Sequence, residues 1–243
     1  GIMGIIDEVR ETAGPIVSLG GGFMLDGATT ERGAAFGLDF GEYYALGRGG
    51  VLGDVDASVV ADAFVVFAPE VVTMMWNAAR LLREPDAAAQ SYSQACQDWG
   101  RVHFAHAENL DEISSVLAKI VNAATTTDAP LFSGWRTLPL PSDAPALVAQ
   151  QLHVLRELRG GLHGVALKAA GLTPLEAVMV HSPAMAPMFG WADGDLATPT
   201  TKAAHAKAEQ ITDELVAPAY EVLDEAERAR LVVLLNDLVA ATT

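Results

Sequence analysis

The chain has 243 residues, 51% of them hydrophobic, and carries a formal net charge of −16. This charge disfavours general binding to a nucleic-acid backbone, which relies on lysine and arginine to replace condensed counterions. Its one cysteine, Cys96, excludes an internal disulfide and a zinc site built from thiolates.

The apolar residues are too dispersed to predict a membrane protein. The longest apolar region, Val59 to Trp76, is interrupted by Asp62, Pro69 and Glu70, so a transmembrane helix is not expected. The first residues, GIMGII, lack a basic region and a cleavage-site pattern, and we therefore expect no signal peptide. These features predict a cytoplasmic protein without a membrane partner.

Helical periodicity dominates the first half of the chain, whereas alternating strand patterns are scarce. Capping residues and apolar spacing predict helices over residues 29–46, 56–67, 69–83, 86–99 and 111–124. The glycine-rich segments Gly20–Gly22 and Gly47–Gly53 look like flexible connectors, and the second lacks the Lys-Ser/Thr of a phosphate-binding loop. Residues 125–145 are rich in proline and predict a connection between two domains, residues 1–124 and 146–243.

The second half has clearer helix boundaries. A helix over residues 145–158 is predicted to end at Gly160-Gly161, and a short helix over 162–170 to end at Gly171. The segment Thr173 to Glu176 then combines an N-cap, a proline at the first helical position and a capping-box glutamate. An irregular segment, residues 182–200, precedes two final helices over residues 201–217 and 225–241.

This order, a short helix, a glycine turn, a capped helix, an irregular segment and two long helices, is typical of a winged helix-turn-helix module with a dimerisation tail. The final segment, residues 196–239, resembles the tail of MarR-type regulators. Most of the chain resembles an actinobacterial helix-turn-helix family called SalK/EvbL-like. The matching segments are FVVFAPEVV (Phe64 to Val72), APLF (Ala129 to Phe132), LRELRGGLHG (Leu155 to Gly164) and AAGLTPLEAVMVH (Ala169 to His181). The resemblance implies a role in transcription regulation.

The chain departs from that family in three places. Leu158, and a position near Val17, are apolar where the family has histidine. Only ADGDLATP follows Trp191 before Thr200, so we expect a shortened wing and recognition segment. Between His181 and Lys202 there is no arginine, lysine, asparagine or glutamine, the residues that read base edges. These residues make DNA binding doubtful, although the family implies it.

The charged cluster Arg156, Glu157, Arg159, His163 and His181 lies in an otherwise apolar stretch. Such groups are paired, hydrogen-bonded or functional. One interpretation is that they hold helix ends together. The other is a pocket for a small or anionic ligand, in which Arg159 and His163 converge beside backbone amides at Leu162. Apolar walls would then come from Met179, Met185, Met188 or Trp191.

A metal site is not predicted. His103 and His106 are three positions apart and can share a helical face, but the sequence indicates no third ligand for them. We expect neither a metal nor another cofactor, and no motif of paired catalytic carboxylates or of a nucleophile stands out.

We therefore predict an all-α protein, a helical N-terminal half packed on a degenerate winged helix-turn-helix-like C-terminal half. The leading hypothesis is a regulator-like protein that binds a small ligand or a protein partner instead of DNA. The alternatives are a DNA-binding transcriptional regulator and a small-molecule tailoring enzyme that uses the arginine and histidine cluster. Apolar spacing in the tail predicts a homodimer through Leu223, Leu231, Leu234, Leu235 and Leu238.

Overall fold

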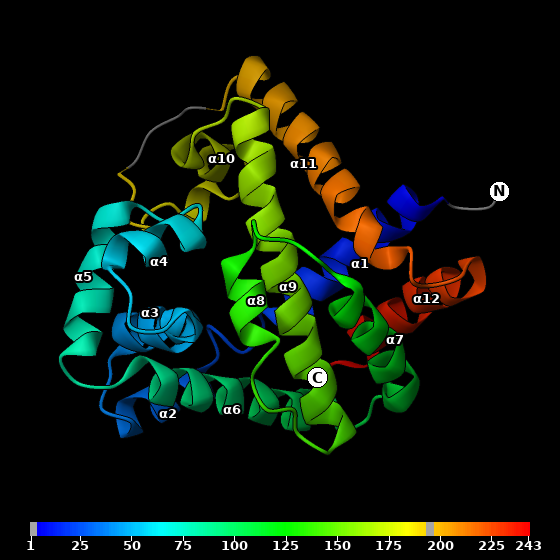
Figure 1. Cartoon of the computed structure of the whole chain (residues 1–243), viewed down its shortest axis with the longest axis horizontal. Helices are drawn as coiled ribbons and strands as arrows, with labels where there is room; N and C mark the ends of the chain where they lie inside the picture. The colour runs from blue at the N-terminus through cyan, green and yellow to red at the C-terminus, as the bar shows by residue number, and fades with distance from the viewer. Residues whose placement is uncertain (1–3, 193–196) are drawn as a thin grey trace.

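The computed structural model describes residues 4–192 and 197–243, and within those ranges every regular element is a helix (Figure 1). The predicted all-α fold class is therefore confirmed. The first half contains α1 (Ile5–Gly20), α2 (Gly27–Ala35), α3 (Phe40–Gly49), η1 (Gly50–Leu52), α4 (Ala57–Phe64), α5 (Pro69–Arg80), α6 (Pro85–His103) and α7 (Leu110–Ala123). The second half contains α8 (Pro130–Trp135), α9 (Ala144–Ala169), α10 (Pro174–His181), η2 (Pro183–Met185), α11 (Pro199–Tyr220) and α12 (Glu225–Ala241).

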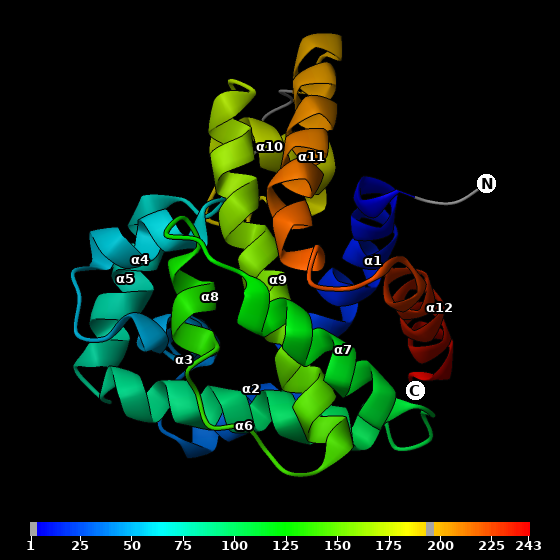
Figure 2. The ribbon, with the colours of Figure 1, turned by 45° about the vertical axis from the view of Figure 1, so that its right-hand side comes forward.

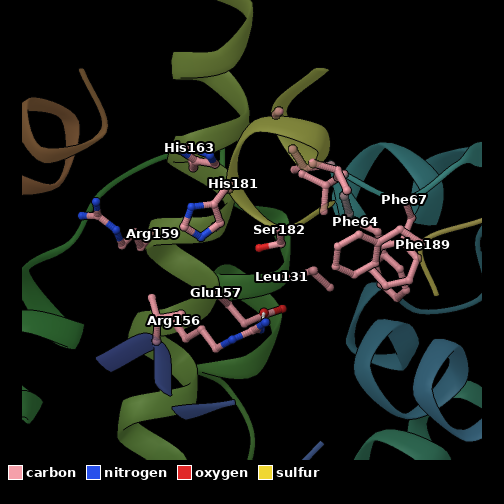
Figure 3. A pocket seen from close by; sticks show the side chains of 18 of the residues that line it. Phe64, Phe67, Leu131, Arg156, Glu157, Arg159, His163, His181, Ser182 and Phe189 are labelled. Atoms are coloured by element: carbon pink, nitrogen blue, oxygen red, sulfur yellow. Dashed lines mark hydrogen bonds and ion pairs between the residues drawn. The ribbon is translucent and has the colours of Figure 1, made fainter. Parts of the chain in front are cut away.

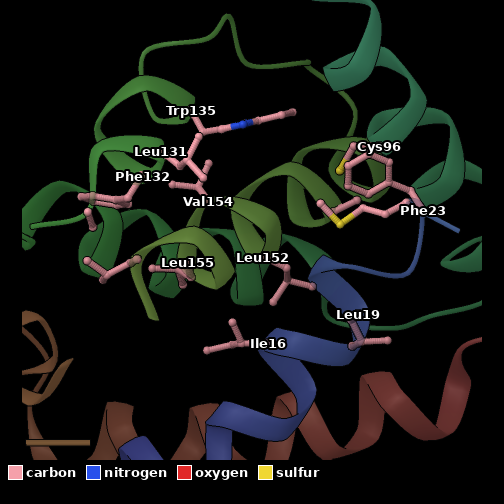
Figure 4. Packing of buried hydrophobic residues seen from close by; sticks show 14 of the residues in the cluster. Ile16, Leu19, Phe23, Cys96, Leu131, Phe132, Trp135, Leu152, Val154 and Leu155 are labelled. Carbon is pink, nitrogen blue, oxygen red and sulfur yellow. The ribbon is translucent and has the colours of Figure 1, made fainter. Parts of the chain in front are cut away.

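Helix α9 is the centre of the fold and packs against α1, α6, α7, α8 and α11 (Figures 1 and 2). Its buried residues occur on all sides of the helix, which is the pattern of a helix surrounded by others. Figure 4 shows Leu152 and Leu155 of α9 between Ile16 of α1 and Phe132 of α8, within a single hydrophobic cluster. This helix carries most of the predicted site residues into the interior.

The predicted break at Gly160-Gly161 is wrong, because both residues lie inside the continuous helix α9. Gly161 is needed for close packing instead: a Cβ atom there would lie 2.6 Å from Cα of Ala129. Burial of the helix outweighs the low helix propensity of the two glycines. Since no helix begins at Leu162, there are no free backbone amides at that point to bind an anion.

Two other predictions about the first half are also corrected. The single helix predicted over residues 29–46 is two helices, separated at Gly37, which has φ +89°, and restarted by a capping box of Asp39 and Glu42. Apart from Gly53, the glycines of the two glycine-rich segments pack closely on other parts of the chain and do not form flexible connectors. Gly20 ends α1, and a Cβ atom there would lie 2.6 Å from the carbonyl oxygen of Leu152.

The proline-rich connection contains ordered structure. Residues Pro130–Trp135 form α8, and Trp135 is fully buried, its indole Nε1 donating to the carbonyl oxygen of Arg48 at 3.0 Å. The division of the chain into two domains stays a prediction.

The C-terminal helices begin where capping residues place them. Asp224 and Glu227 form the expected capping box, and α12 has the predicted bounds. The five leucines on which the homodimer prediction was based are buried within the chain, where α12 packs on α1 and α7. The homodimer stays a prediction, but it would need a different surface. None of the described helices combines the length and the hydropathy that crossing a membrane requires.

Candidate functional site

A cavity of about 490 Å³ lies between α1, α3, α4, α8, α9, α10 and α11. Figure 3 shows that its polar residues come mainly from α9 and α10, while aromatic side chains form the opposite wall. The volume is within the range of pockets that bind small organic molecules, roughly 300–1,000 Å³.

Five of the six residues predicted as ligand-binding line this cavity: Arg156, Glu157, Arg159, His163 and His181. The sixth, Trp191, does not line it. Its indole Nε1 donates to the carbonyl oxygen of Val66 at 2.7 Å, so it holds the segment after α10 against the N-terminal half. The predicted methionine walls are also absent among the lining residues.

Aromatic residues form the apolar wall instead. Phe64 and Phe67 pack against each other with ring centroids 5.4 Å apart, and Phe189 packs on Phe67 at 4.7 Å. Val65, between the first two, has φ 58°, a conformation that is costly for a β-branched residue. The local sequence FVVF predicts a helix through Phe67, but α4 ends at Phe64 and this turn brings both rings to the cavity.

Glu157 is paired with two arginines on one side of the cavity. Arg48 of α3 donates to Oε1 of Glu157 from Nη2 at 2.9 Å, and Arg156 donates to the same oxygen from Nη1 at 3.1 Å. Burial by itself raises the pKa of the Glu157 carboxyl, but the guanidinium groups of Arg48 and Arg156 help to outweigh that effect and leave its pKa lowered. The carboxylate is therefore ionised, and Glu157, Arg48 and Arg156 together keep one positive charge.

Arg48 was missed by sequence reasoning because it lies in the glycine-rich segment that looked like a connector. Its guanidinium also donates to the hydroxyl of Tyr44 at 3.1 Å and lies 4.6 Å from the ring centroid of Phe64. These contacts place a buried cation between the charged and the aromatic side of the cavity. An arginine in an apolar helix was the available signal.

Arg159 is more fully paired than Arg156, because it contacts two carboxylates. It donates to Oδ1 of Asp213 at 2.9 Å and to Oε2 of Glu209 at 3.2 Å, both on α11. Arg10 also contacts Asp213, at 3.3 Å. Arg159 therefore joins α9 to α11, in line with the interpretation that part of the charged cluster holds helices together.

Three histidines and a glutamate form the second polar group of the cavity. His163 of α9 and His205 of α11 have ring centroids 6.0 Å apart, and the His181 ring stacks on that of His205 at 5.4 Å. Oε1 of Glu209 lies 3.6 Å from Nδ1 of His163 and 3.9 Å from Nε2 of His205. Burial lowers the pKa of both His163 and His205, against the opposing effect of Glu209.

Sequence reasoning missed His205 and Glu209. Their four-residue spacing in HAKAE puts both on one face of α11, and this was the signal that could have found them. His103, by contrast, stacks on Trp99 with centroids 4.6 Å apart. Among the described residues, the one group of three histidine or acidic side chains close enough to hold a metal ion is His163, His205 and Glu209.

The segment that would follow the second helix of a helix-turn-helix is fixed to the N-terminal half. The backbone N–H of Ala68 donates to the carbonyl oxygen of Phe189 at 2.8 Å, and Gly190 packs closely on Val71. Part of the segment in which we expect a shortened wing, residues 193–196, lies outside the described residues.

Comparison of the sequence with known families gives one match. The sequence model of a helix-turn-helix family matches residues 9–196, which is most of the chain. No curated protein and no solved structure matches this chain. Most helices that line the cavity, α3, α4, α8, α9, α10 and all but the first turn of α1, fall in the matched range, whereas α11 follows it. The chain belongs to this helix-turn-helix family.

Proposed function

We propose that this protein is a regulator-like member of the helix-turn-helix family that binds a small organic anion in the cavity beside α9. The ligand class is a compound with an aromatic or branched aliphatic body and one carboxylate or similar anionic group. The observation that carries the proposal is the position of Arg156, whose guanidinium lines the cavity. Its one hydrogen bond to the described residues goes to Glu157, and that carboxylate is already paired with Arg48.

The charge of the cavity supports an anionic ligand. Arg48 and Arg156 share the single carboxylate of Glu157, which leaves one positive charge at that side of the cavity. Arg159 is already paired with Glu209 and Asp213, and the whole chain has a net charge of −16. A positive excess held in an apolar, partly enclosed space attracts an anion more strongly than the same charge on the surface. A guanidinium with unused N–H donors can bind a carboxylate through two parallel hydrogen bonds.

The aromatic wall supports an apolar body for the same ligand. Phe64, Phe67 and Phe189 line the side of the cavity opposite the charged groups (Figure 3). Ligand sites commonly combine such apolar walls with a few polar groups that set orientation. A molecule that places its ring on Phe67 and its carboxylate on Arg156 uses both sides.

The family also supports a second candidate, a DNA-binding transcriptional regulator. Two features favour the ligand-binding role over it. Helix α10 contains no lysine or arginine, and the segment after it is occupied in packing on Phe67, Ala68 and Val71. A helix-turn-helix protein reads base edges with an exposed second helix that carries such side chains.

The test uses two probes of the same shape, naphthalene-2-carboxylate and naphthalene-2-carboxamide, and measures binding by isothermal titration calorimetry. We expect the carboxylate to bind more tightly than the amide. Arg156→Gln should weaken the carboxylate by about tenfold or more, since a hydrogen bond to a charged group contributes about 1.5–3 kcal/mol. The same substitution should leave the affinity for the carboxamide unchanged, whereas Phe67→Ala should weaken the binding of both probes.

The matched control is Arg230→Gln, which removes an exposed arginine paired with Glu112 outside the cavity. Equal binding of carboxylate and amide, or equal losses in Arg156→Gln and Arg230→Gln, would show that Arg156 does not recognise an anion. Absence of binding for both probes would count against the cavity as a ligand site.

A further inference from the structure

We propose that His163, His205 and Glu209 form a binding site for a divalent transition-metal ion of the zinc type at the α11 side of the cavity. One ligand atom from each side chain lies within 4.8 Å of the others. The proposal does not rest on the anionic ligand proposed above, because it is carried by a different group of side chains and concerns the metal alone.

The spacing of the three groups fits an ion better than it fits direct contacts among them. Oε1 of Glu209 lies 3.6 Å from Nδ1 of His163 and 3.9 Å from Nε2 of His205, and both distances are too long for good hydrogen bonds. Ligand atoms around a tetrahedral zinc ion are about 3.3 Å apart, given metal–ligand distances of about 2.0–2.1 Å. Small side-chain rotations would close the remaining gap around an ion.

The carboxylate of Glu209 is oriented by a residue that would not itself bind the ion, as is common for metal ligands. Arg159 donates to Oε2 of Glu209 at 3.2 Å, while Oε1 is the oxygen nearer to the two histidines. This arrangement orients the carboxylate without using the oxygen that would bind the ion. Such outer contacts set ligand orientation in metal sites.

A second outer contact fixes His163. The Thr212 hydroxyl donates to the carbonyl oxygen of Ala208 at 2.7 Å and lies 3.0 Å from Nδ1 of His163. A hydroxyl has one hydrogen, so both bonds form only when Nδ1 of His163 carries the proton and donates to Thr212. Coordination through Nδ1, the nitrogen 3.6 Å from Oε1 of Glu209, would replace this bond, so Thr212 orients the His163 ring in the metal-free protein.

The two imidazoles are largely shielded from water. The side chains of His205 and His163 are 11% and 21% exposed. Two imidazoles and one carboxylate from the protein also leave a coordination position for water or for a ligand in the cavity.

The experiment titrates the full-length chain, stripped with EDTA, with Zn²⁺ and with Co²⁺. Calorimetry with a competing chelator gives the zinc affinity and stoichiometry, and the visible absorption of Co²⁺ reports the number of ligands. We expect one ion per chain and an intense Co²⁺ band. His205→Ala should lower zinc affinity by about 100-fold or more and abolish the band, because even outer-shell changes cost about 10–100-fold.

Glu209→Gln is the second variant, since Glu209 is 44% exposed and its amide can keep the contact with Arg159. It should lower zinc affinity at least about tenfold with an unchanged circular dichroism spectrum. The matched control is His106→Ala, which removes an exposed histidine outside the group. The proposal is overturned if zinc does not bind, or if Glu209→Gln and His205→Ala bind it as tightly as His106→Ala does.

Discussion

Arg48 and Glu157, which are 109 positions apart in the sequence, form a buried ion pair in which Nη2 of Arg48 lies 2.9 Å from Oε1 of Glu157. Nε of the same guanidinium lies 3.2 Å from each carboxylate oxygen. The pair joins α3 to the central helix α9 at the floor of the cavity, so the fold and the candidate site depend on the same two side chains.

We expect Glu157→Gln to destabilise the protein strongly. The change leaves the Arg48 guanidinium buried without its carboxylate, and breaking a buried pair in this way costs about 3–5 kcal/mol. Urea unfolding followed by circular dichroism measures the loss in the free energy of unfolding. The control is Glu112→Gln, in an exposed pair with Arg230, for which a loss below about 1 kcal/mol is expected. Similar losses in the two variants would contradict the prediction.

We also expect the stability of the protein to fall as the pH drops below 6.5, in part because of His153. Burial lowers the pKa of His153 from 6.5 to about 3, against the opposing effect of Glu157. The unfolded chain therefore takes up this proton first. The contribution is fully present above pH 6.5 and is lost progressively between pH 6.5 and about 3.

The slope gives the test. One proton corresponds to about 1.4 kcal/mol per pH unit, so His153→Gln should flatten the dependence of the unfolding free energy on pH by about that amount between pH 6 and 5. Comparing slopes removes the general cost of the substitution, which includes the loss of ring contacts with Trp135 and Phe23. Equal slopes for the two proteins would show that His153 is not held neutral by burial.

Local signals in the sequence predicted part of the fold. The starts of α10 and α12 follow from Thr173 with Glu176 and from Asp224 with Glu227, because a capping box acts within four residues. Helix α1 was not predicted, since Pro15 lies inside it and disfavours a helix locally. Its stability comes from burial of residues such as Ile16 against α9, which no local pattern reveals.

The candidate site was also predicted only in part, because the sequence shows local clusters of residues but not the contacts between distant helices. Arg156, Glu157, Arg159, His163 and His181 stand out because they are charged or titratable residues in one apolar stretch. Their partners Arg48 and Glu209 come from α3 and α11 and are brought to the cavity only by packing. The aromatic wall was missed because it depends on the turn at Val65.

The glycine pair of α9 provides a prediction with a built-in control. Gly161→Ala should destabilise the protein by about 1–3 kcal/mol, because its Cβ atom would lie 2.6 Å from Cα and Cβ of Ala129. Gly160→Ala meets no atom within 4 Å and should instead stabilise the helix by about 0.5–1 kcal/mol. Urea unfolding of the two variants tests both signs. Destabilisation by Gly160→Ala would indicate a helix break at the pair.

DNA binding gives the last prediction. We expect the affinity for random duplex DNA at physiological salt to be weaker than the roughly 10⁻⁴–10⁻⁶ M typical of nonspecific binding by DNA-binding proteins. The net charge of −16 repels the backbone, and α10 offers no lysine or arginine to a groove. Fluorescence anisotropy with a labelled duplex measures this affinity.

The salt dependence separates the two candidate functions. A protein that displaces counterions gains affinity steeply as salt is lowered, whereas this chain should show little gain between about 200 and 50 mM salt. A micromolar affinity with a steep salt dependence would favour the DNA-binding regulator. It would also mean that the segment around Phe189 leaves its contact with Phe67 when DNA binds, because that contact now holds the segment against the N-terminal half.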